Sequence, residues 1–310
     1  MSTQITTAFV QQYKANVEHL LQQKGSRLRP YVRVESQNAE YEFYDRIGAT
    51  NALEVTGRHQ DTPLITVPHD RRRVSLRDFD WAELIDRTDR IRLLIDPTSP
   101  YSQNAGFALG RKMDEIIIES AFGTVYTGKT GSSSVTHPAG QVIAVDYVES
   151  GSAANSGLTI GKLRRAKQIL DQNETDPSDP RYIICTAKQI NDLLQSTEVT
   201  SADFNSVKAL VQGDVNTFMG FEFIRTELVA TDANSYRRVI CYSKSGLLLA
   251  VGADVNVDIG PRRDKRNSTQ VYCSASFGAV RMEEEKYLKL NVQNKEVTNG
   301  CNNSKFYRVW

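Results

Sequence analysis

The sequence predicts an α+β protein, and two patterns lead to that prediction. Residues 268–281 alternate apolar and polar side chains with a period of two, which is typical of a half-buried β-strand. Residues 101–122 instead repeat apolar side chains at helical spacing and end before Gly123, which indicates one long helix. Other helix and strand signals follow without a regular βαβ order, so we expect a mixed fold rather than a parallel α/β sheet.

Composition excludes several classes of protein. The chain has 310 residues, 40% of them hydrophobic, which is enough to bury a sizeable core in one or two domains. Lys and Arg number 38 and Asp and Glu 37, and this balance argues against a dedicated nucleic-acid-binding domain. Apolar runs are too short for a membrane span, and the first residues lack the basic-then-apolar layout of a secretion signal. We therefore expect a soluble protein made in a cytosol.

The first expected element is an amphipathic helix over residues 6–24, ending at Gly25. Such a helix either faces the core of its own domain or docks on another chain, and the sequence leaves both open. Its apolar stripe is formed by Phe9, Val10, Tyr13, Val17, Leu20 and Leu21.

Residues 41–94 have the pattern of extended chain. Gly57, Pro63 and Pro68 punctuate it, so we expect strands joined by turns in a long β-hairpin. Acidic and basic side chains then alternate densely over Arg77–Leu94. These charges either form a solvated face with local ion pairs or match charges on a neighbouring subunit.

The long helix is expected to begin near residue 99, with Ser99 as its N-cap and Pro100 in its first turn. At about 1.5 Å per residue it would span roughly 35 Å before Gly123. The next expected elements are a Gly/Ser/Thr-rich loop (128–140), a strand (141–148), a helix (158–173), a strand (181–186), a helix (187–196), strand segments (218–228, 237–243 and 246–259) and a basic loop (262–266).

Residues able to carry catalysis or bind a metal are dispersed. Cys185, Cys241 and Cys273 lie in apolar, strand-like runs and are expected in the core, whereas Cys301 lies in a polar tail and is a candidate exposed thiol. The four histidines show no zinc-ligand spacing. We therefore assign no catalytic residue, no metal ligand and no cofactor.

One motif suggests nucleotide chemistry. Gly123–Thr130 matches GxxxxGK[ST], in which backbone N–H groups and a lysine hold phosphates between a strand and a helix. Here a long predicted helix precedes the glycine, and a Gly/Ser-rich loop follows. Because a chance match in such a chain is expected on the order of 1% of the time, the string alone is a weak signal. A P-loop-like nucleotide-binding protein remains an alternative that the context disfavours.

The basic loop Arg262–Arg266 supplies a second alternative, a nucleic-acid-binding protein that contacts phosphates. A solvated loop explains the same residues without a ligand. Nucleic-acid binding would require an affinity that falls steeply with salt.

Four segments carry a family resemblance: the run from Gly57 to Gly123; GLTIGKLRRAKQILDQNET followed by RYIICTAKQINDLL; MGFEFIRTELV; and STQVYCSASFGAVRMEEEKYLKL. In their order along the chain and in their residue patterns they resemble the major capsid proteins of tailed double-stranded-DNA bacteriophages, which share the Hong Kong 97-type fold. The first looks like the extended loop running into the spine helix. The second and third look like the axial domain, and the fourth is similar to the final strand of the peripheral domain.

This resemblance implies a division of the chain. Val271, Cys273, Ala275 and Phe277 would pack against the spine helix, while Tyr272 and the acidic run after it would face other subunits. The implied parts are an N-terminal arm (1–40), an extended β-hairpin loop (41–95), a peripheral domain with the spine helix (96–155), an axial domain (156–264), a return to the peripheral domain (265–293) and a C-terminal tail (294–310).

The resemblance also implies a function. The protein would be structural, not an enzyme, and would assemble through hexameric and pentameric capsomers into an icosahedral capsid around the phage genome, in the host cytoplasm. Its partners would be other copies of itself, a separate scaffolding protein, a portal and a decoration protein. Packaged DNA would be contacted weakly and non-specifically, and no membrane would be involved. Inter-subunit contacts are expected at Phe9, Tyr13, Val17, Leu21, Arg71, Arg72, Arg73, Asp78, Asp80, Asp86, Arg87, Asp89, Arg90 and Trp310.

Overall fold

The computed structural model describes residues 22–58, 61–62, 64–86, 98–149, 151–195 and 217–294. The chain divides into two compact units, each built from two stretches of sequence. Unit 1 combines Met1–His137 with Leu247–Met282, and unit 2 combines Pro138–Gly246 with Glu283–Trp310. Helices and several sheets are mixed without βαβ order, which confirms the α+β class.

The larger sheet of unit 1 is built around a long antiparallel hairpin. Its strand order is β1-β12-β13-β4. The hairpin pairs from Leu247 opposite Arg281 to Arg262 opposite Ser268, and β4 then pairs antiparallel with the other side of β13. The strand bounds are β1 (Arg33–Ser36), β4 (Arg77–Ile85), β12 (Leu247–Arg262) and β13 (Ser268–Arg281).

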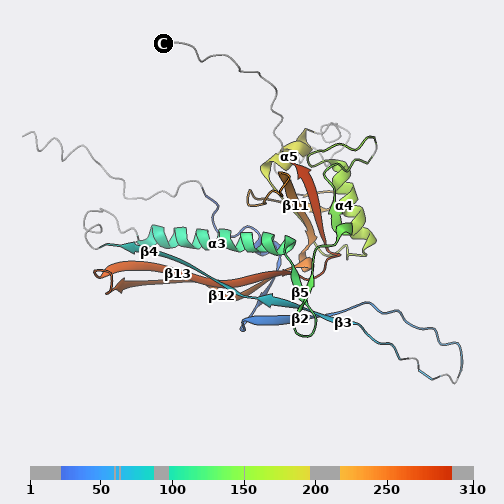
Figure 1. Cartoon of the computed structure of the whole chain (residues 1–310), viewed down its shortest axis with the longest axis horizontal. Helices are drawn as coiled ribbons and strands as arrows, with labels where there is room; N and C mark the ends of the chain where they lie inside the picture. The colour runs from blue at the N-terminus through green and yellow to red at the C-terminus, as the bar shows by residue number, and fades with distance from the viewer. Residues whose placement is uncertain are drawn as a thin grey trace, which may run out of the picture. The chain divides into compact units, whose positions relative to one another are not determined.

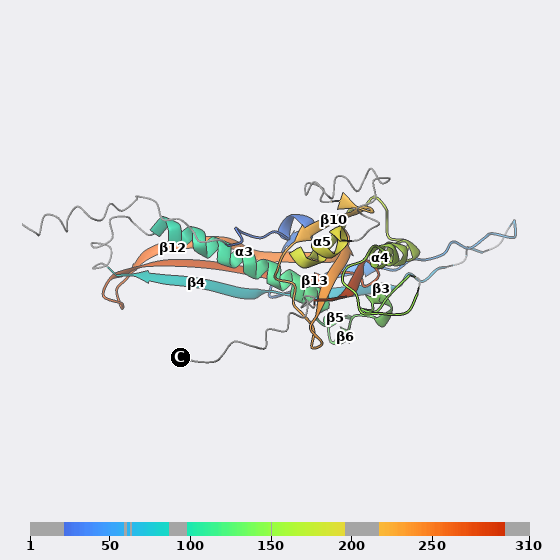
Figure 2. The ribbon, with the colours of Figure 1, turned by 90° about the horizontal axis from the view of Figure 1, so that it is seen from above.

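The long helix α3 (Thr98–Phe122) packs along this sheet, against β13, β4 and β12 (Figures 1 and 2). Its buried residues recur every three or four positions, as the sequence predicted; they include Ala105, Leu109, Met113, Ile116, Ile117 and Ala121. Beneath it, the alternation in β13 is confirmed, because Val271, Cys273, Ala275 and Phe277 are all buried. The predicted N-cap was wrong, since the helix already includes Thr98 and Ser99 lies inside its first turn.

The smaller sheet of unit 1 contains the predicted β-hairpin. It has the order β2-β3-β5-β6, with β2 (Tyr41–Ile47) and β3 (His69–Ser75) paired from Tyr41 opposite Ser75 to Ile47 opposite His69. Two strands that follow α3 in the chain, β5 (Val125–Thr127) and β6 (Ser133–Val135), complete this sheet, with β5 paired to β3 and β6 paired to β5. The described residues of the 48–68 connection project from the strands as a loop without helix or strand (Figure 1). At the base of this loop the Gly48 N–H donates to the Pro68 carbonyl at 2.9 Å.

The described residues of unit 2 form a six-stranded sheet with the order β7-β14-β11-β8-β10-β9 and two α-helices. The predicted helices and most strands are present. The elements are β7 (Val142–Ile143), α4 (Ile160–Gln172), β8 (Arg181–Cys185), α5 (Ala187–Leu194), β9 (Thr217–Phe218), β10 (Phe221–Arg225), β11 (Tyr236–Ser243) and β14 (Tyr287–Gln293).

Two expectations for this part of the chain need correction. The strand predicted over 141–148 shrinks to β7, because Tyr147 N–H donates to the Ala144 carbonyl and closes a turn there. The long final strand is two strands, since residues 282–286 turn and β14 then pairs with β11 and β7 in unit 2. Residues 247–262 form β12, which pairs along its length with β13, so the second stretch of unit 1 begins at Leu247.

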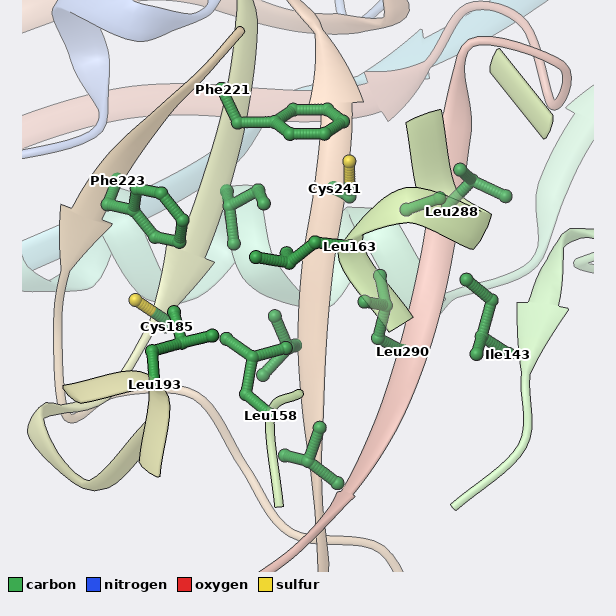
Figure 3. Packing of buried hydrophobic residues seen from close by; sticks show 14 of the residues in the cluster. Ile143, Leu158, Leu163, Cys185, Leu193, Phe221, Phe223, Cys241, Leu288 and Leu290 are labelled. Atoms are coloured by element: carbon green, nitrogen blue, oxygen red, sulfur yellow. The ribbon is translucent and has the colours of Figure 1, made fainter. Parts of the chain in front are cut away.

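The core of unit 2 lies between its sheet and α4 (Figure 3). Leu163 of α4 belongs to one buried cluster with Cys241, Leu288 and Leu290 of the sheet, and Phe221 and Phe223 of β10 belong to the same cluster. Cys185 and Cys241 are fully buried here and Cys273 is fully buried in unit 1, so their predicted role as core residues is confirmed. Cys301 lies outside the described residues.

Unit 2 also contains a charged side chain that is fully buried. Lys162 of α4 is fully inaccessible, and its Nζ donates to the carbonyls of Val145 and Ser156, both at 2.9 Å, of Gly157 at 3.1 Å and of Asn291 at 3.3 Å. Burial lowers the pKa of this ammonium group from 10.5 to about 8, although nearby carboxylates oppose the shift. Lys162 therefore ties the loop before α4 to β14.

Candidate assembly surfaces

The three arginines of the predicted charged strip do not share one surface. They are consecutive in β3, so their side chains alternate between the two faces of the small sheet. Arg72 is only 2% exposed and its Nε donates to the Met282 carbonyl at 3.2 Å. Arg72 belongs to the inside of its own subunit, which removes it from the candidate contact residues.

Arg71 and Arg73 lie on the opposite face, among aromatic rings. The Arg73 Cζ is 5.1 Å from the Tyr41 ring centroid and 4.6 Å from that of Tyr126, so the guanidinium group lies between two rings. Arg71 lies over Phe43 at 5.5 Å. The rings of this face are 36–48% exposed. We call Tyr41, Phe43, Arg71, Arg73 and Tyr126 the Arg–aromatic face.

An ionic cluster on the inner side of the same sheet fixes its register. Asp70 accepts hydrogen bonds from Arg46 of β2 and from the Thr127 hydroxyl of β5. Burial alone would raise the pKa of Asp70, but the hydrogen bonds from Thr127 and Arg46 outweigh it and hold the pKa at about 2. Arg46 also donates to the Met282 carbonyl at 2.5 Å. These contacts place the side chains of the Arg–aromatic face by fixing the strands that carry them.

The predicted acidic residues of β4 lie on the face of the large sheet that points away from α3. Asp78 and Asp80 are exposed, and the Tyr272 hydroxyl of β13 donates to Asp80 at 2.7 Å. The register places Asp258 of β12 beside Tyr272 on the same side. We call Asp78, Asp80, Asp258 and Tyr272 the acidic face. Asp86 is bound within the subunit, since it accepts from the Ser268 hydroxyl at 2.5 Å.

The remaining predicted contact residues fall outside the described part of the chain: Phe9, Tyr13, Val17, Leu21, Arg87, Asp89, Arg90 and Trp310. The structure does show how residues 23–28 are held. The buried carboxylate of Asp114 in α3 accepts from the Ser26 hydroxyl at 2.5 Å and from the N–H groups of Arg27 and Leu28 at 2.9 and 3.1 Å. Gly110 allows this approach, since a Cβ there would lie 2.5 Å from the Gly25 backbone.

Sequence reasoning missed a set of exposed apolar residues. In the 48–68 connection, every described residue is exposed, and Leu64 is 94% exposed. The set comprises Ile47, Leu53, Val55, Leu64, Ile65 and Val67. Large apolar residues in a Gly- and Pro-punctuated stretch, with no helix or strand of their own to cover them, are the signal that could have identified it.

A second missed feature lies along β12. Among the described residues, β1 pairs only with residues 248–251 of β12, so the rest of that strand has a neighbour on one side only, β13. Val255, Val257 and Ile259 of this edge are 36–47% exposed. An unpaired edge with apolar side chains is a surface suited to contact with another chain.

The nucleotide-binding alternative fails on geometry. Gly123 follows the end of α3, and residues 125–135 form the β5–β6 hairpin with Lys129 exposed in its turn. A phosphate loop needs a helix N-terminus, whereas the C-terminal carbonyls of α3 lie here. Arg281 already binds that end, with its Nη1 2.8 Å from the carbonyl oxygens of Ala121 and Gly123.

Other chemistry is equally unsupported by the described residues. They contain no group of three or more His, Cys, Asp or Glu side chains that could hold a metal ion. Burial raises the pKa of Cys185 to about 12, which keeps its thiol protonated. In the basic loop, Arg262 binds Asp264 at 2.6 and 2.8 Å, so part of its positive charge is neutralised locally. No helix among the described residues is both long and apolar enough to cross a membrane.

The long α3 on a four-stranded sheet, the open β2–β3 hairpin and a separate six-stranded unit define the Hong Kong 97-type capsid fold. Solved capsids share it at low sequence identity. The capsid structure of cyanophage P-SCSP1u is similar with a TM-score of 0.71 and 16% identity, over 95% of this chain and 96% of that chain. The capsid of Ralstonia phage GP4 is similar with a TM-score of 0.74 and 11% identity, over 93% of this chain and 96% of that chain. The structure from Mycobacterium phage Che8 is similar with a TM-score of 0.65 and 13% identity, over 91% of this chain and 97% of that chain.

The family follows from the sequence itself. The family model described as phage capsid protein matches residues 5–294, and the chain therefore belongs to that family. No curated protein matches the sequence significantly. The chain is a structural major capsid protein of the virion shell, which it forms by self-assembly, and it is not an enzyme.

Proposed function

We propose that copies of this chain form hexameric and pentameric capsomers, and that the 48–68 connection of each copy lies against its neighbour. The observation behind this proposal is the set of exposed apolar residues on that connection, from Leu53 to Val67, together with Ile47 at the end of β2. A monomeric soluble protein rarely leaves so many large apolar side chains on a projecting loop. A neighbouring subunit supplies the cover that the loop lacks within the described part of its own chain.

The energetics of such a contact suit a shell. Burying one Val, Leu or Ile side chain contributes about 1.5–3 kcal/mol, and association and loop ordering oppose much of that sum. The net contact between two copies is therefore modest. Because every copy repeats the contact around a closed assembly, modest contacts still give a stable container.

The same proposal assigns roles along the chain. Residues 1–40 act as the arm and 41–95 as the extended loop. Unit 1, with α3 as its spine, acts as the peripheral domain, unit 2 acts as the axial domain, and residues 294–310 act as the tail. A separate scaffolding protein, a portal and a decoration protein join the shell, and assembly takes place in the host cytoplasm. The net charge of +1 supports only weak, non-specific contact with packaged DNA.

Leu64→Asp tests the proposal. Leu64 makes no contribution to its own subunit's core, so the variant subunit should fold normally, with an unchanged circular dichroism spectrum. We expect it to form no shells in sedimentation and negative-stain microscopy. Thr62→Asp places the same charge on an exposed polar position of the same connection and should assemble. Normal shells from Leu64→Asp would refute the role of the connection.

A further inference from the structure

We infer that the Arg–aromatic face of one copy binds the acidic face of a second copy. This inference rests on the proposed function, because it names the contact through which assembling copies recognise each other. The two faces lie on different sheets of unit 1 and carry opposite charge. A patch that binds a different patch on the next copy is heterologous, and such contacts close into rings when the rotation allows.

Within the described part of the chain, Arg73 presents the positive charge of its face without a counter-ion. Its guanidinium group lies between the rings of Tyr41 and Tyr126, and among the described residues no carboxylate forms an ion pair with it and no acceptor takes a hydrogen bond from it. Contacts with aromatic rings do not use the guanidinium N–H groups as hydrogen-bond donors to oxygen acceptors, so these donors remain able to bind a partner. A planar carboxylate is the ligand that this donor edge fits best.

The rest of the face holds Arg73 in place before any partner arrives. Phe43 lies opposite Arg73 in the β2–β3 pair, and Tyr126 lies opposite it in the β3–β5 pair. Gly131 completes the enclosure with φ +65°, because a Cβ there would lie 2.7 Å from the Arg73 Cδ and 3.1 Å from the Phe43 Cε1. A side chain fixed in this way loses little conformational freedom on binding. Tyrosine and arginine are also the residues that contribute most at protein interfaces.

The acidic face supplies the complementary charge. Asp78 and Asp258 are exposed, and within the described residues neither has an ion-pair partner. The register brings residues 78–84 of β4, 270–276 of β13 and 256–260 of β12 to this face at alternate positions, and none of those positions holds Lys or Arg. The next alternate position of β12 is Arg262, which donates to Gln270 at 3.1 Å and is already paired with Asp264. The Tyr272 hydroxyl fixes Asp80 by donating to it, so this carboxylate is also held before binding.

A second copy is the partner that the charges favour over nucleic acid. Aromatic rings and arginines can stack on bases, but a nucleic-acid groove needs several uncompensated cations along the phosphate backbone. On this face Arg71 is already neutralised, because its Nε lies 2.9 Å from an Asp45 carboxylate oxygen. Among the described residues of this face, Arg73 is a cation without an ion pair beside three exposed rings. That arrangement matches a carboxylate-bearing protein surface, and this chain carries such a surface itself.

A charge exchange tests the inference. Arg73→Glu alone, and Asp78→Lys with Asp80→Lys alone, should each slow shell formation about tenfold in light scattering, because like charges then face each other. Combining all three substitutions should bring the rate back to within about threefold of wild type, since the charges again match. Arg33→Glu reverses an exposed charge outside both faces and serves as the control. Circular dichroism confirms that each variant folds. If Arg73→Glu does not fold, Arg73→Gln replaces it in the test; this variant removes the charge without reversing it and should slow shell formation less than about tenfold.

The outcomes separate this inference from the proposed function. If wild-type protein forms neither shells nor ring-shaped capsomers, alone or expressed with its neighbouring phage genes, the capsomer proposal itself fails. If wild type assembles and either reversal assembles as fast, or the combined variant is no faster than the single reversals, only the pairing of the two faces is refuted. If Arg73→Glu and Arg73→Gln assemble normally but lose affinity for a single-stranded oligonucleotide, nucleic acid occupies the face and the inference is wrong.

Discussion

Arg281→Met should destabilise unit 1 more than any surface substitution. The Arg281 side chain is fully buried at the end of β13, and its Nη1 donates to the carbonyls of Ala121 and Gly123 at 2.8 Å and of Ser120 at 3.3 Å. The last carbonyls of a helix have no partner within the helix, and a cation there also complements the helix dipole. Arg281 therefore joins the C-terminal end of α3 to the sheet on which α3 packs.

The size of the effect follows from those contacts. A hydrogen bond to a charged donor contributes about 1.5–3 kcal/mol, and a buried carbonyl left without a donor costs about 1–3 kcal/mol. Methionine keeps most of the volume and recovers the cost of burying a charge. With two short bonds lost and that recovery subtracted, we expect the free energy of unfolding to fall by about 3 kcal/mol.

Urea unfolding of the unassembled subunit measures this change. Trp81 fluorescence in a Trp310→Phe background reports on unit 1, where Trp81 lies in β4. Arg77→Met is the matched control: Arg77 pairs with Glu119 of α3 at 3.0 Å, but its side chain is 54% exposed, so its loss should cost less than about 1 kcal/mol. If the two variants unfold at the same urea concentration, the role assigned to Arg281 is wrong.

Three further predictions concern other buried contacts. The pKa of Lys162 is about 8 in the folded protein and 10.5 in the unfolded chain, so between these pH values the unfolded state binds more protons. The stability of wild type relative to Lys162→Met should therefore be constant below pH 8 and rise up to about pH 10.5. Urea unfolding of both proteins at about pH 7 and pH 10 checks the sign, and an equal stability difference at the two pH values would contradict it. Asp114→Ala removes the acceptor that fixes the 23–28 segment, so trypsin should cleave after Lys24 or Arg27 faster than in wild type, and an unchanged cleavage rate would refute the anchor. Gly278→Ala would place a Cβ 2.2 Å from the Ser75 carbonyl and should lower the thermal midpoint, whereas Gly106→Ala meets no atom within 4 Å and should not; equal midpoints would contradict this packing.

Periodicity in the sequence was sufficient for the elements with one clearly buried face. The apolar stripe of residues 101–122 and the alternation over 268–281 correspond to α3 and β13, because each pattern records which side chains the same sheet-helix contact buries. The resemblance to tailed-phage capsid proteins then supplied the fold and function, which composition and periodicity alone did not reach.

Features that depend on long-range register could not be predicted in the same way. Nothing local indicates that β4 pairs with β13, whose partner residues lie 184 (Thr269 and Ile85) to 200 (Phe277 and Arg77) positions away, or that residues 287–293 join another sheet. Arg72 was assigned to a surface because its neighbours are arginines. Val74 shares its face and is 1% exposed, so the alternation from Val74 back to Arg72 was the available signal. The strand expected over 141–148 failed because a turn over Val145 and Asp146 interrupts the apolar run, and Asp146, a residue type common in turns, was the only local signal for it within the run.

Sedimentation velocity with negative-stain microscopy, on the protein expressed alone and together with its neighbouring phage genes, tests the central claim most directly. The account predicts closed shells or ring-shaped capsomers in at least one preparation. A folded monomer in both preparations would contradict the claim that self-assembly is the function of this chain.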